Sequence, residues 1–133
     1  MVTVKYRREH HSLTLLYTHL VYVTKYRKKL FELKHLDRLE EIFKATAEKM
    51  NFKVIEFNGE SDHIHVLVEY PPKLSISQIT NSLKGVSSRY LRKEYPEMKK
   101  YKALWSPSYF AVSSGGCPIE TLKKYIQNQK KPS

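Results

Sequence analysis

The chain has 133 residues, the size of one domain with its own hydrophobic core. Lysine and arginine number 24 against 13 acidic residues, and this formal charge of +11 favours nucleic acid as a partner over anionic membrane. The longest apolar run, residues 13–23, is too short and too polar to span a bilayer, and the single Cys117 excludes an internal disulfide. We therefore expect one cytoplasmic domain over residues 1–133, associated with the nucleoid when it binds DNA.

The first half of the chain predicts a strand followed by a helix. Residues 1–11 are polar and basic, and we expect them to be loosely ordered. Residues 13–24 are rich in β-branched and aromatic side chains, which predicts a first strand, and residues 25–29 form a basic loop. Apolar residues recur every three to four positions over residues 32–50, which is the pattern of an amphipathic helix.

A predicted hairpin follows this helix. Residues 52–57 alternate as a second strand, and Asn58-Gly59 opens a turn that ends at Asp62. The third strand covers residues 63–70 and stops at a Pro-Pro pair, which cannot continue a ladder of hydrogen bonds.

Ser75 is a suitable N-cap for a second helix that reaches about residue 95. A fourth strand is expected at residues 109–113, and a mobile C-terminal helix at residues 118–130. The order β-α-β-β-α-β predicts an α+β fold of the ferredoxin-like type: an antiparallel sheet with both helices on one face and an appended terminal helix.

His63 and His65 occupy alternate positions of the third strand, so both imidazoles point to the same face. The apolar residues between them should face the helices, which leaves the histidines on the uncovered face. Two imidazoles there can share one divalent metal ion, with Asp62 orienting one of them from behind. The alternative is that they are ordinary hydrogen-bonding residues of a sheet.

Tyr125 and Gln129 are four residues apart in the predicted terminal helix and therefore lie on one helix face. The amide oxygen of Gln129 is a candidate third ligand, suited to Mg²⁺ or Mn²⁺. The phenol of Tyr125 is a candidate nucleophile, because a tyrosyl phosphodiester separates strand cleavage from strand rejoining. The alternative for Tyr125 is a tyrosine that only packs, on the apolar side of an amphipathic helix beside Leu122 and Ile126.

Together these segments resemble the single-tyrosine HUH transposases of insertion sequences (the IS200/IS605-like family). Asp62-His63-Ile64-His65 resembles the histidine–hydrophobic–histidine motif, and the segment from Tyr125 to Gln129 resembles the family's tyrosine with its glutamine four residues on. Weaker likenesses cover residues 23–27, 84–89, 104–105 and 113–116, in the family's order.

The resemblance implies a homodimer in which the tyrosine helix of one subunit completes the metal site of the other. Gly115 and Gly116 would be the hinge of that helix, because glycine tolerates unusual backbone angles. It also implies cleavage and rejoining of single-stranded DNA at hairpin-bearing element ends through a 5′-phosphotyrosine.

With such a substrate, basic residues and the tryptophan become candidate DNA contacts, through phosphates and through base stacking. The candidates are Lys25, Arg27, Lys28, Lys84, Arg89, Arg92, Lys93 and Trp105.

Two other functions remain open from the sequence. One is a related HUH endonuclease that processes repeats or replication origins. The other is a non-enzymatic module that binds single-stranded nucleic acid on its uncovered sheet face, although such a module is expected to carry aromatic residues there rather than paired histidines.

Overall fold

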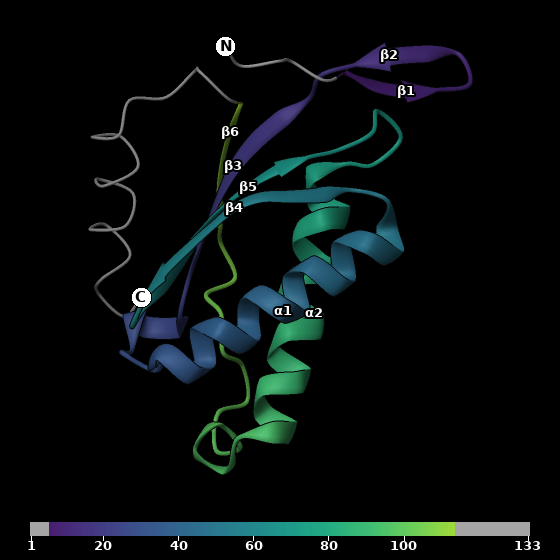
Figure 1. The fold of residues 1–133 in the computed structure, drawn as a ribbon. Helices are drawn as coiled ribbons and strands as arrows, with labels where there is room; N and C mark the ends of the chain where they lie inside the picture. The colour runs from purple at the N-terminus through teal and green to yellow at the C-terminus, as the bar shows by residue number, and fades with distance from the viewer. Residues whose placement is uncertain (1–5, 114–133) are drawn as a thin grey trace.

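The computed structural model of the protein describes residues 6–113, which form an antiparallel sheet with both long helices on one face (Figure 1). The residues predicted as hinge, nucleophile and third ligand, Gly115, Gly116, Tyr125 and Gln129, lie outside this range, as does the predicted terminal helix. The elements are, in chain order, β1 (Arg7–Glu9), β2 (Ser12–Thr14), β3 (Tyr17–Val23), η1 (Lys25–Arg27), α1 (Leu33–Met50), β4 (Lys53–Glu60), β5 (His63–Glu69), α2 (Ile76–Glu94), η2 (Pro96–Met98) and β6 (Phe110–Ser113).

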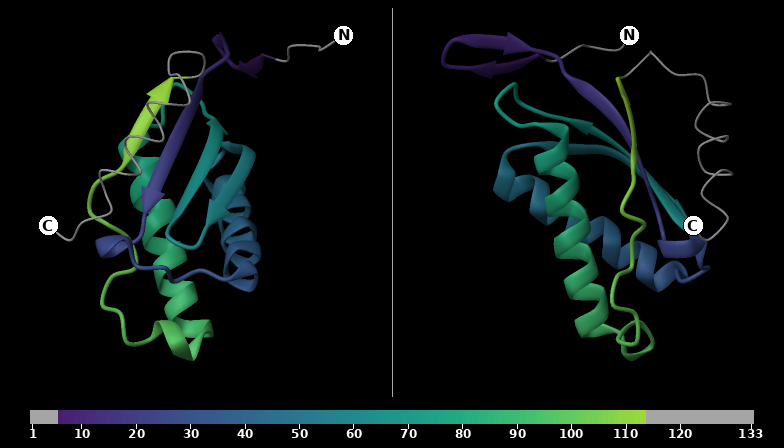
Figure 2. Two further views of the ribbon diagram at one scale, coloured as in Figure 1. Left: turned by 90° about the vertical axis from the view of Figure 1, so that its left-hand side faces the viewer. Right: turned by 180° about the vertical axis from the view of Figure 1, so that it is seen from behind.

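The main sheet has the strand order β4-β5-β3-β6, and every neighbouring pair is antiparallel. Figure 2 shows α1 and α2 together behind the sheet when its strands face the viewer. This arrangement confirms the predicted ferredoxin-like plan, with β3 and β5 as the two central strands. Among the described residues, no helix is both long enough and apolar enough to cross a membrane.

Both helices begin near the predicted positions. The Ser75 hydroxyl accepts a hydrogen bond from the backbone N–H of Gln78 at 3.0 Å, and the Gln78 side chain accepts one from the N–H of Ser75 at 2.8 Å. This reciprocal capping box starts α2 at the expected cap. The helix α1 ends at Met50, and the capping residue Asn51 has a φ of 64°, the left-handed conformation typical of a helix C-terminus.

The core lies between the helices and the sheet. Fully buried side chains come from β3, β5, α1 and α2, and they include Leu20, Tyr22, Ile64, Val66, Leu39, Phe43, Ile79 and Leu83. The apolar residues of β5 thus face the helices, as the alternating pattern of that strand predicts.

The predicted turn at Asn58-Gly59 is wrong, because β4 continues to Glu60 and pairs with His63. A Cβ atom on Gly59 would lie 2.7 Å from Leu36 Cδ2 in α1 and 3.1 Å from Ile64 Cγ2. Gly59 therefore permits the close approach of helix and strand, and the reversal falls at residues 61–62.

The predicted first strand is two strands. Residues 12–14 belong to a separate hairpin in which β2 pairs with β1, while β3 starts at Tyr17. Residues 7–9, expected to be loosely ordered, form β1. Side-chain patterning alone does not reveal this break, because both segments have strand-like composition.

One ion pair joins the hairpin to the main sheet. The guanidinium of Arg7 donates to both carboxylate oxygens of Glu69, at 2.8 and 2.7 Å, and both side chains are about nine-tenths buried. A bidentate pair of this kind combines charge with fixed geometry. It anchors β1 at the end of β5.

Replacing Arg7 with leucine should leave the Glu69 carboxylate buried without its partner. We expect the free energy of unfolding, measured with urea at neutral pH, to fall by about 3 kcal/mol. The matched control Arg8→Leu, at an exposed position in the same strand, should change it by less than about 0.5 kcal/mol. Equal stability of Arg7→Leu and the unmodified protein would show that the pair does not hold the hairpin.

Candidate active site

His63 and His65 lie in β5 on the sheet face opposite the helices, which we call the histidine face. Their partners across β3 are Val23 and Val21, and their partners across β4 are Glu60 and Asn58. The intervening Ile64 is fully buried toward the helices. The two imidazoles therefore share one face, as their spacing predicts.

Asp62 holds the ring of His63. Its Oδ1 lies 2.8 Å from Nδ1 of His63, and its Oδ2 accepts a hydrogen bond from Nε of Arg27 at 2.6 Å. Burial alone would raise the pKa of Asp62, but the hydrogen bonds from His63 and Arg27 outweigh it and hold the pKa below its ordinary value. An ionised carboxylate only accepts, so Nδ1 of His63 carries the proton and Nε2 offers a lone pair.

The short turn that carries Arg27 has an unusual backbone. Tyr26 and Arg27 are consecutive non-glycine residues with φ values of 58° and 53°. Each such residue costs roughly 1–2 kcal/mol. Two bonds of Thr24 brace the turn: its hydroxyl donates to the carbonyl of Lys28 at 2.6 Å, and its N–H donates to the carbonyl of Asp62 at 2.9 Å. The strained backbone brings the Arg27 side chain to Asp62.

His19 is a third histidine of this face that sequence reasoning missed. It lies in β3 opposite Leu67, and its Nδ1 is 2.9 Å from Nε2 of His65, with the two rings stacked at 5.1 Å. Burial, together with the neighbouring His19, lowers the pKa of His65, so His65 stays neutral near pH 7. His19 lies beside His65 because of the register in which β3 pairs with β5. Sequence reasoning did not predict that register.

The donor set on this face fits a divalent cation. Oxygen and nitrogen atoms of Glu60, Asp62 and His63 lie within 4.8 Å of one another, and Oε2 of Glu60 is 3.8 Å from Nε2 of His63. Neutral imidazole and carboxylate are ligands for Mn²⁺ and related metals. Nε2 of His65 is engaged with His19, so coordination through that atom requires exchange of this hydrogen bond.

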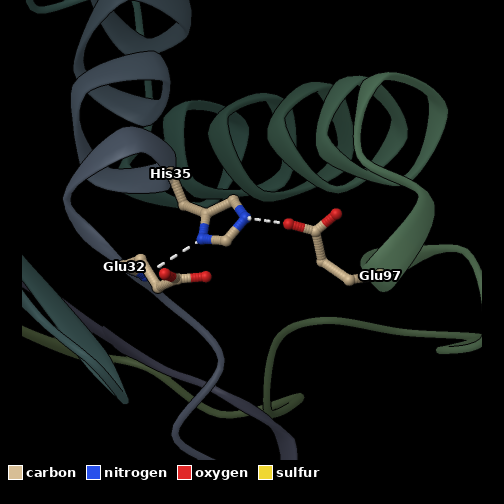
Figure 3. A group of neighbouring side chains, drawn as sticks. All are labelled: Glu32, His35 and Glu97. Atoms are coloured by element: carbon tan, nitrogen blue, oxygen red, sulfur yellow. Dashed lines mark hydrogen bonds and ion pairs between the residues drawn. The ribbon is translucent and has the colours of Figure 1, made fainter.

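A second cluster of metal-ligand residues, Glu32, His35 and Glu97, has a structural role (Figure 3). Nδ1 of the buried His35 accepts from the backbone N–H of Glu32 at 2.9 Å, and its Nε2 lies 3.1 Å from Oε2 of Glu97. Lys34 is 2.9 Å from the same oxygen and, as the main cause, lowers the pKa of Glu97 to about 2. Both ring nitrogens are thus engaged, and the cluster fastens the start of α1 to η2.

Three of the predicted DNA contacts, Lys25, Arg27 and Lys28, lie in or beside η1, close to Asp62. Arg89, Arg92 and Lys93 lie on α2, in the helical layer behind the sheet. Arg89 contributes to a cavity of about 350 Å³ between α1 and α2. The structure therefore brings only the first group near the histidines.

Trp105 and Lys84 make contacts inside the protein. Trp105 is only 6% exposed, its Nε1 donates to the hydroxyl of Ser87 at 3.0 Å, and it packs on Phe31, so in this structure its ring lies inside the protein. The ammonium group of Lys84 donates to the carbonyls of Ser106 and Ser108 at 2.6 and 2.9 Å. Burial lowers the pKa of Lys84 to about 8.

Comparison with known proteins identifies the family. The family model described as "Transposase IS200 like" matches residues 12–129, so the chain belongs to the IS200-like transposase family. It is an enzyme of the transposase class. This confirms the resemblance seen in the sequence, and it excludes the non-enzymatic binding module.

Two curated relatives agree. The transposase for insertion sequence element IS200 of Salmonella typhimurium is 32% identical over 114 residues, which cover 84% of this chain and 74% of that protein. The ISDra2 transposase TnpA of Deinococcus radiodurans is 30% identical over 114 residues, covering 84% and 81%.

Two solved structures share the fold. A crystal structure from Deinococcus radiodurans R1, assigned as a transposase, has a TM-score of 0.88 and 25% identity, and the match covers 94% of this chain and 98% of that one. A REP-associated tyrosine transposase bound to a REP hairpin has a TM-score of 0.60 and 11% identity, covering 93% and 68%. At 11% identity, the second likeness shows the fold alone.

The lowered pKa of Lys84 predicts a specific pH dependence of stability. Between about pH 8 and its ordinary pKa of 10.5, Lys84 is deprotonated in the folded protein but still protonated in the unfolded chain. The unfolded state then binds more protons, so the free energy of unfolding should rise with pH over this window.

In Lys84→Met this contribution should be absent, so the difference in stability between the two proteins should change with pH from 8 to 10.5. Urea denaturation across this range measures it. The control is Lys93→Met, at an exposed position. Its free energy of unfolding plotted against pH should run parallel to that of the unmodified protein. A Lys84→Met curve that also runs parallel would contradict the buried-amine assignment.

Proposed function

We propose that this transposase cleaves and rejoins single-stranded DNA at the hairpin-bearing ends of an insertion sequence. Tyr125 acts as the nucleophile, and a divalent metal ion, Mg²⁺ or Mn²⁺, is the cofactor. The observation that carries the proposal is the pair of imidazoles on the histidine face, with His63 oriented by Asp62 and His65 kept neutral by burial, in a chain of the IS200-like transposase family.

The metal ligands in this proposal are His63, His65 and Gln129. The donor set supports the histidines, because Asp62 accepts a hydrogen bond from Nδ1–H of His63 and leaves Nε2 as the ring atom that can bind the metal. When bound, the cation supplies Lewis-acid polarisation of a phosphate oxygen. Glu60, 3.8 Å from Nε2 of His63, is a further oxygen donor within reach.

The residues of the chain perform a transesterification. The phenol oxygen of Tyr125 loses its proton and attacks the phosphorus, forming a tyrosyl bond to the 5′ phosphate. The bond from phosphorus to the 3′ oxygen breaks, and that oxygen leaves as a 3′-hydroxyl. Attack by a 3′-hydroxyl on the phosphotyrosine reverses the exchange and rejoins the strands, so no phosphodiester energy is lost to hydrolysis.

The partner is a DNA hairpin with single-stranded flanks. The formal charge of +11 supports a polyanionic substrate. A structure with the same fold, the REP-associated tyrosine transposase, is bound to a REP hairpin, and this supports a hairpin as the partner proposed here. We further propose a homodimer in which the Tyr125 helix of each subunit completes the site of the other, with Gly115 and Gly116 as the hinge.

A repeat-processing or origin-nicking endonuclease is the alternative with the same chemistry. The curated relatives are transposases of insertion sequences, and this favours transposition. Product analysis separates the two functions, because only a transposase excises a segment and joins two distant ends.

Replacing Tyr125 with phenylalanine removes the nucleophilic oxygen and keeps the ring. We expect hairpin binding to persist within about twofold, while cleavage and the covalent protein–DNA adduct on a denaturing gel fall by more than about 10⁴-fold. The control Tyr6→Phe, at an exposed tyrosine, should cleave normally. Continued adduct formation by Tyr125→Phe would remove the assigned nucleophile.

The same variant tests the shared site. A dimer of one Tyr125→Phe subunit and one His65→Ala subunit has one intact site only if the tyrosine acts in trans. Mixing two inactive variants that exchange subunits freely should therefore restore about a quarter of the unmodified activity. No recovery, with mixed dimers demonstrated by mass, would place tyrosine and histidines in the same subunit.

Removal of either imidazole should abolish metal-dependent cleavage. His63→Ala and His65→Ala are expected to lose more than about 100-fold in cleavage rate with Mg²⁺ or Mn²⁺, with circular dichroism unchanged. Binding of Mn²⁺ followed by calorimetry gives a second readout that does not depend on DNA. The exposed His10→Ala is the control; equal cleavage and Mn²⁺ binding by all three variants would argue against a histidine-bound metal.

A further inference from the structure

Beside the histidine face, a cavity of about 230 Å³ opens between the η1 turn and the segment that precedes Trp105. We call it the tyrosine–lysine pocket, after six of the nine residues that line it: Lys25, Tyr26, Lys28, Lys100, Tyr101 and Lys102. The other three are the apolar Leu30, Ala103 and Leu104. Since one water molecule takes up roughly 30 Å³ in the liquid, the space is large enough for a group of several heavy atoms.

The lining has the chemistry of a site for single-stranded nucleic acid. Among the described residues it contains four lysines, two tyrosines and no carboxylate. The Nζ atom of Lys28 is 5.1 Å from the centre of the Tyr101 ring, and that of Lys100 is 5.3 Å from the same centre. Aromatic rings next to cations provide a stacking surface for a base and positive charge for its phosphates.

Tyr26 lines this pocket in a backbone conformation that a bulky residue seldom adopts. It has a φ of 58°, and its side chain is 46% exposed although it is a large aromatic group. Tyr26 is not part of the hydrophobic core, so its exposed ring remains available to a ligand. The same strained turn brings Arg27 to Asp62, so one short segment positions both the Tyr26 ring and the residue that holds Asp62.

The pocket is physically joined to His63. The residue after Tyr26 is Arg27, whose Nε donates to Asp62 at 2.6 Å, and Asp62 in turn holds His63. On the other wall, the N–H of Lys25 donates to the carbonyl of Leu104 at 2.8 Å. One side chain, Asp62, thus links the turn that carries Tyr26 to the histidine face.

We propose that the tyrosine–lysine pocket binds an unpaired base of the DNA strand beside the cleaved linkage, with Tyr26 as the stacking surface and lysines around it on the flanking phosphates. The inference rests on the proposed function, since it takes single-stranded DNA as the substrate. It assigns a specific substrate contact to Tyr26, a residue outside the histidine–tyrosine chemistry.

The experiment compares two fluorescent probes in EDTA, which prevents cleavage: a thymidine 12-mer and an abasic 12-mer with the same phosphates. The unmodified protein should bind the thymidine strand at least about fivefold more tightly, because stacking of one base contributes that much or more. Tyr26→Ala should bind both strands with similar affinity. Tyr26→Phe should keep the preference, because the ring and not the hydroxyl stacks.

Two further measurements use the same probes. Lys102→Gln should weaken the binding of both probes by the same factor. The slope of log affinity against log salt concentration should become shallower by about 0.7, as expected for the loss of one phosphate contact. In the unmodified protein, a 5-iodouracil strand cross-linked by light should attach to Tyr26 or Tyr101, as read by mass spectrometry; this readout does not depend on any variant folding.

The outcomes separate this inference from the proposed function. If the protein binds and cleaves DNA but Tyr26→Ala keeps the full preference for the thymidine strand, the pocket is not a base site and the proposed function stands. If the unmodified protein binds neither strand and does not cleave, both are overturned. Loss of the preference in Tyr26→Ala, with its retention in Tyr26→Phe and a cross-link in the pocket, supports the assignment.

Discussion

The alternation of side-chain direction along β5 determines which residues form the core and which form the histidine face. This strand is flanked by β4 and β3, and its residues Ile64, Val66 and Val68 are fully buried under the helices. Because successive side chains of a strand point to opposite faces, His63 and His65 must then project away from the core. A register slip of one residue would bury both imidazoles and expose the apolar set, so the same burial that stabilises the sheet also holds the histidines in position.

A chain of short polar contacts then turns this position into a defined ring orientation. Arg27 fixes Asp62, and Asp62 fixes the Nδ1 proton of His63. The ion pair is largely buried on both sides, which protects it from screening by salt. The strained η1 turn supplies Arg27, and the hydrogen bonds of Thr24 stabilise that turn. An IS200-like transposase thus orients a candidate ligand through residues far from it in the sequence.

Local signals in the sequence were sufficient for the framework. Period-two and period-3.6 patterns predicted the central strands and both helices, and Ser75 predicted the start of α2, because these features depend on neighbours within a few residues. The paired histidines were found in the same way. Local signals did not predict the roles of Gly59 and Trp105, because both depend on tertiary contacts. Gly59 lies against Leu36 of a packed helix, and Trp105 is buried against Ser87 and Phe31. His19 and Arg27 reach the site only through strand register and a positive-φ turn, and neither has a local signature.

The pairing of β3 with β6 has a consequence for biosynthesis. The central strand β3 is made early, but its second edge is completed only by Phe110–Ser113, at the far end of the described chain. On the ribosome, β3 can meet α1, β4 and β5 well before β6 emerges from the exit tunnel. Until then one edge of the sheet exposes unpaired backbone groups, a template for association with other nascent chains. A translation product interrupted before Phe110 would lack β6 and would be prone to aggregate through this edge.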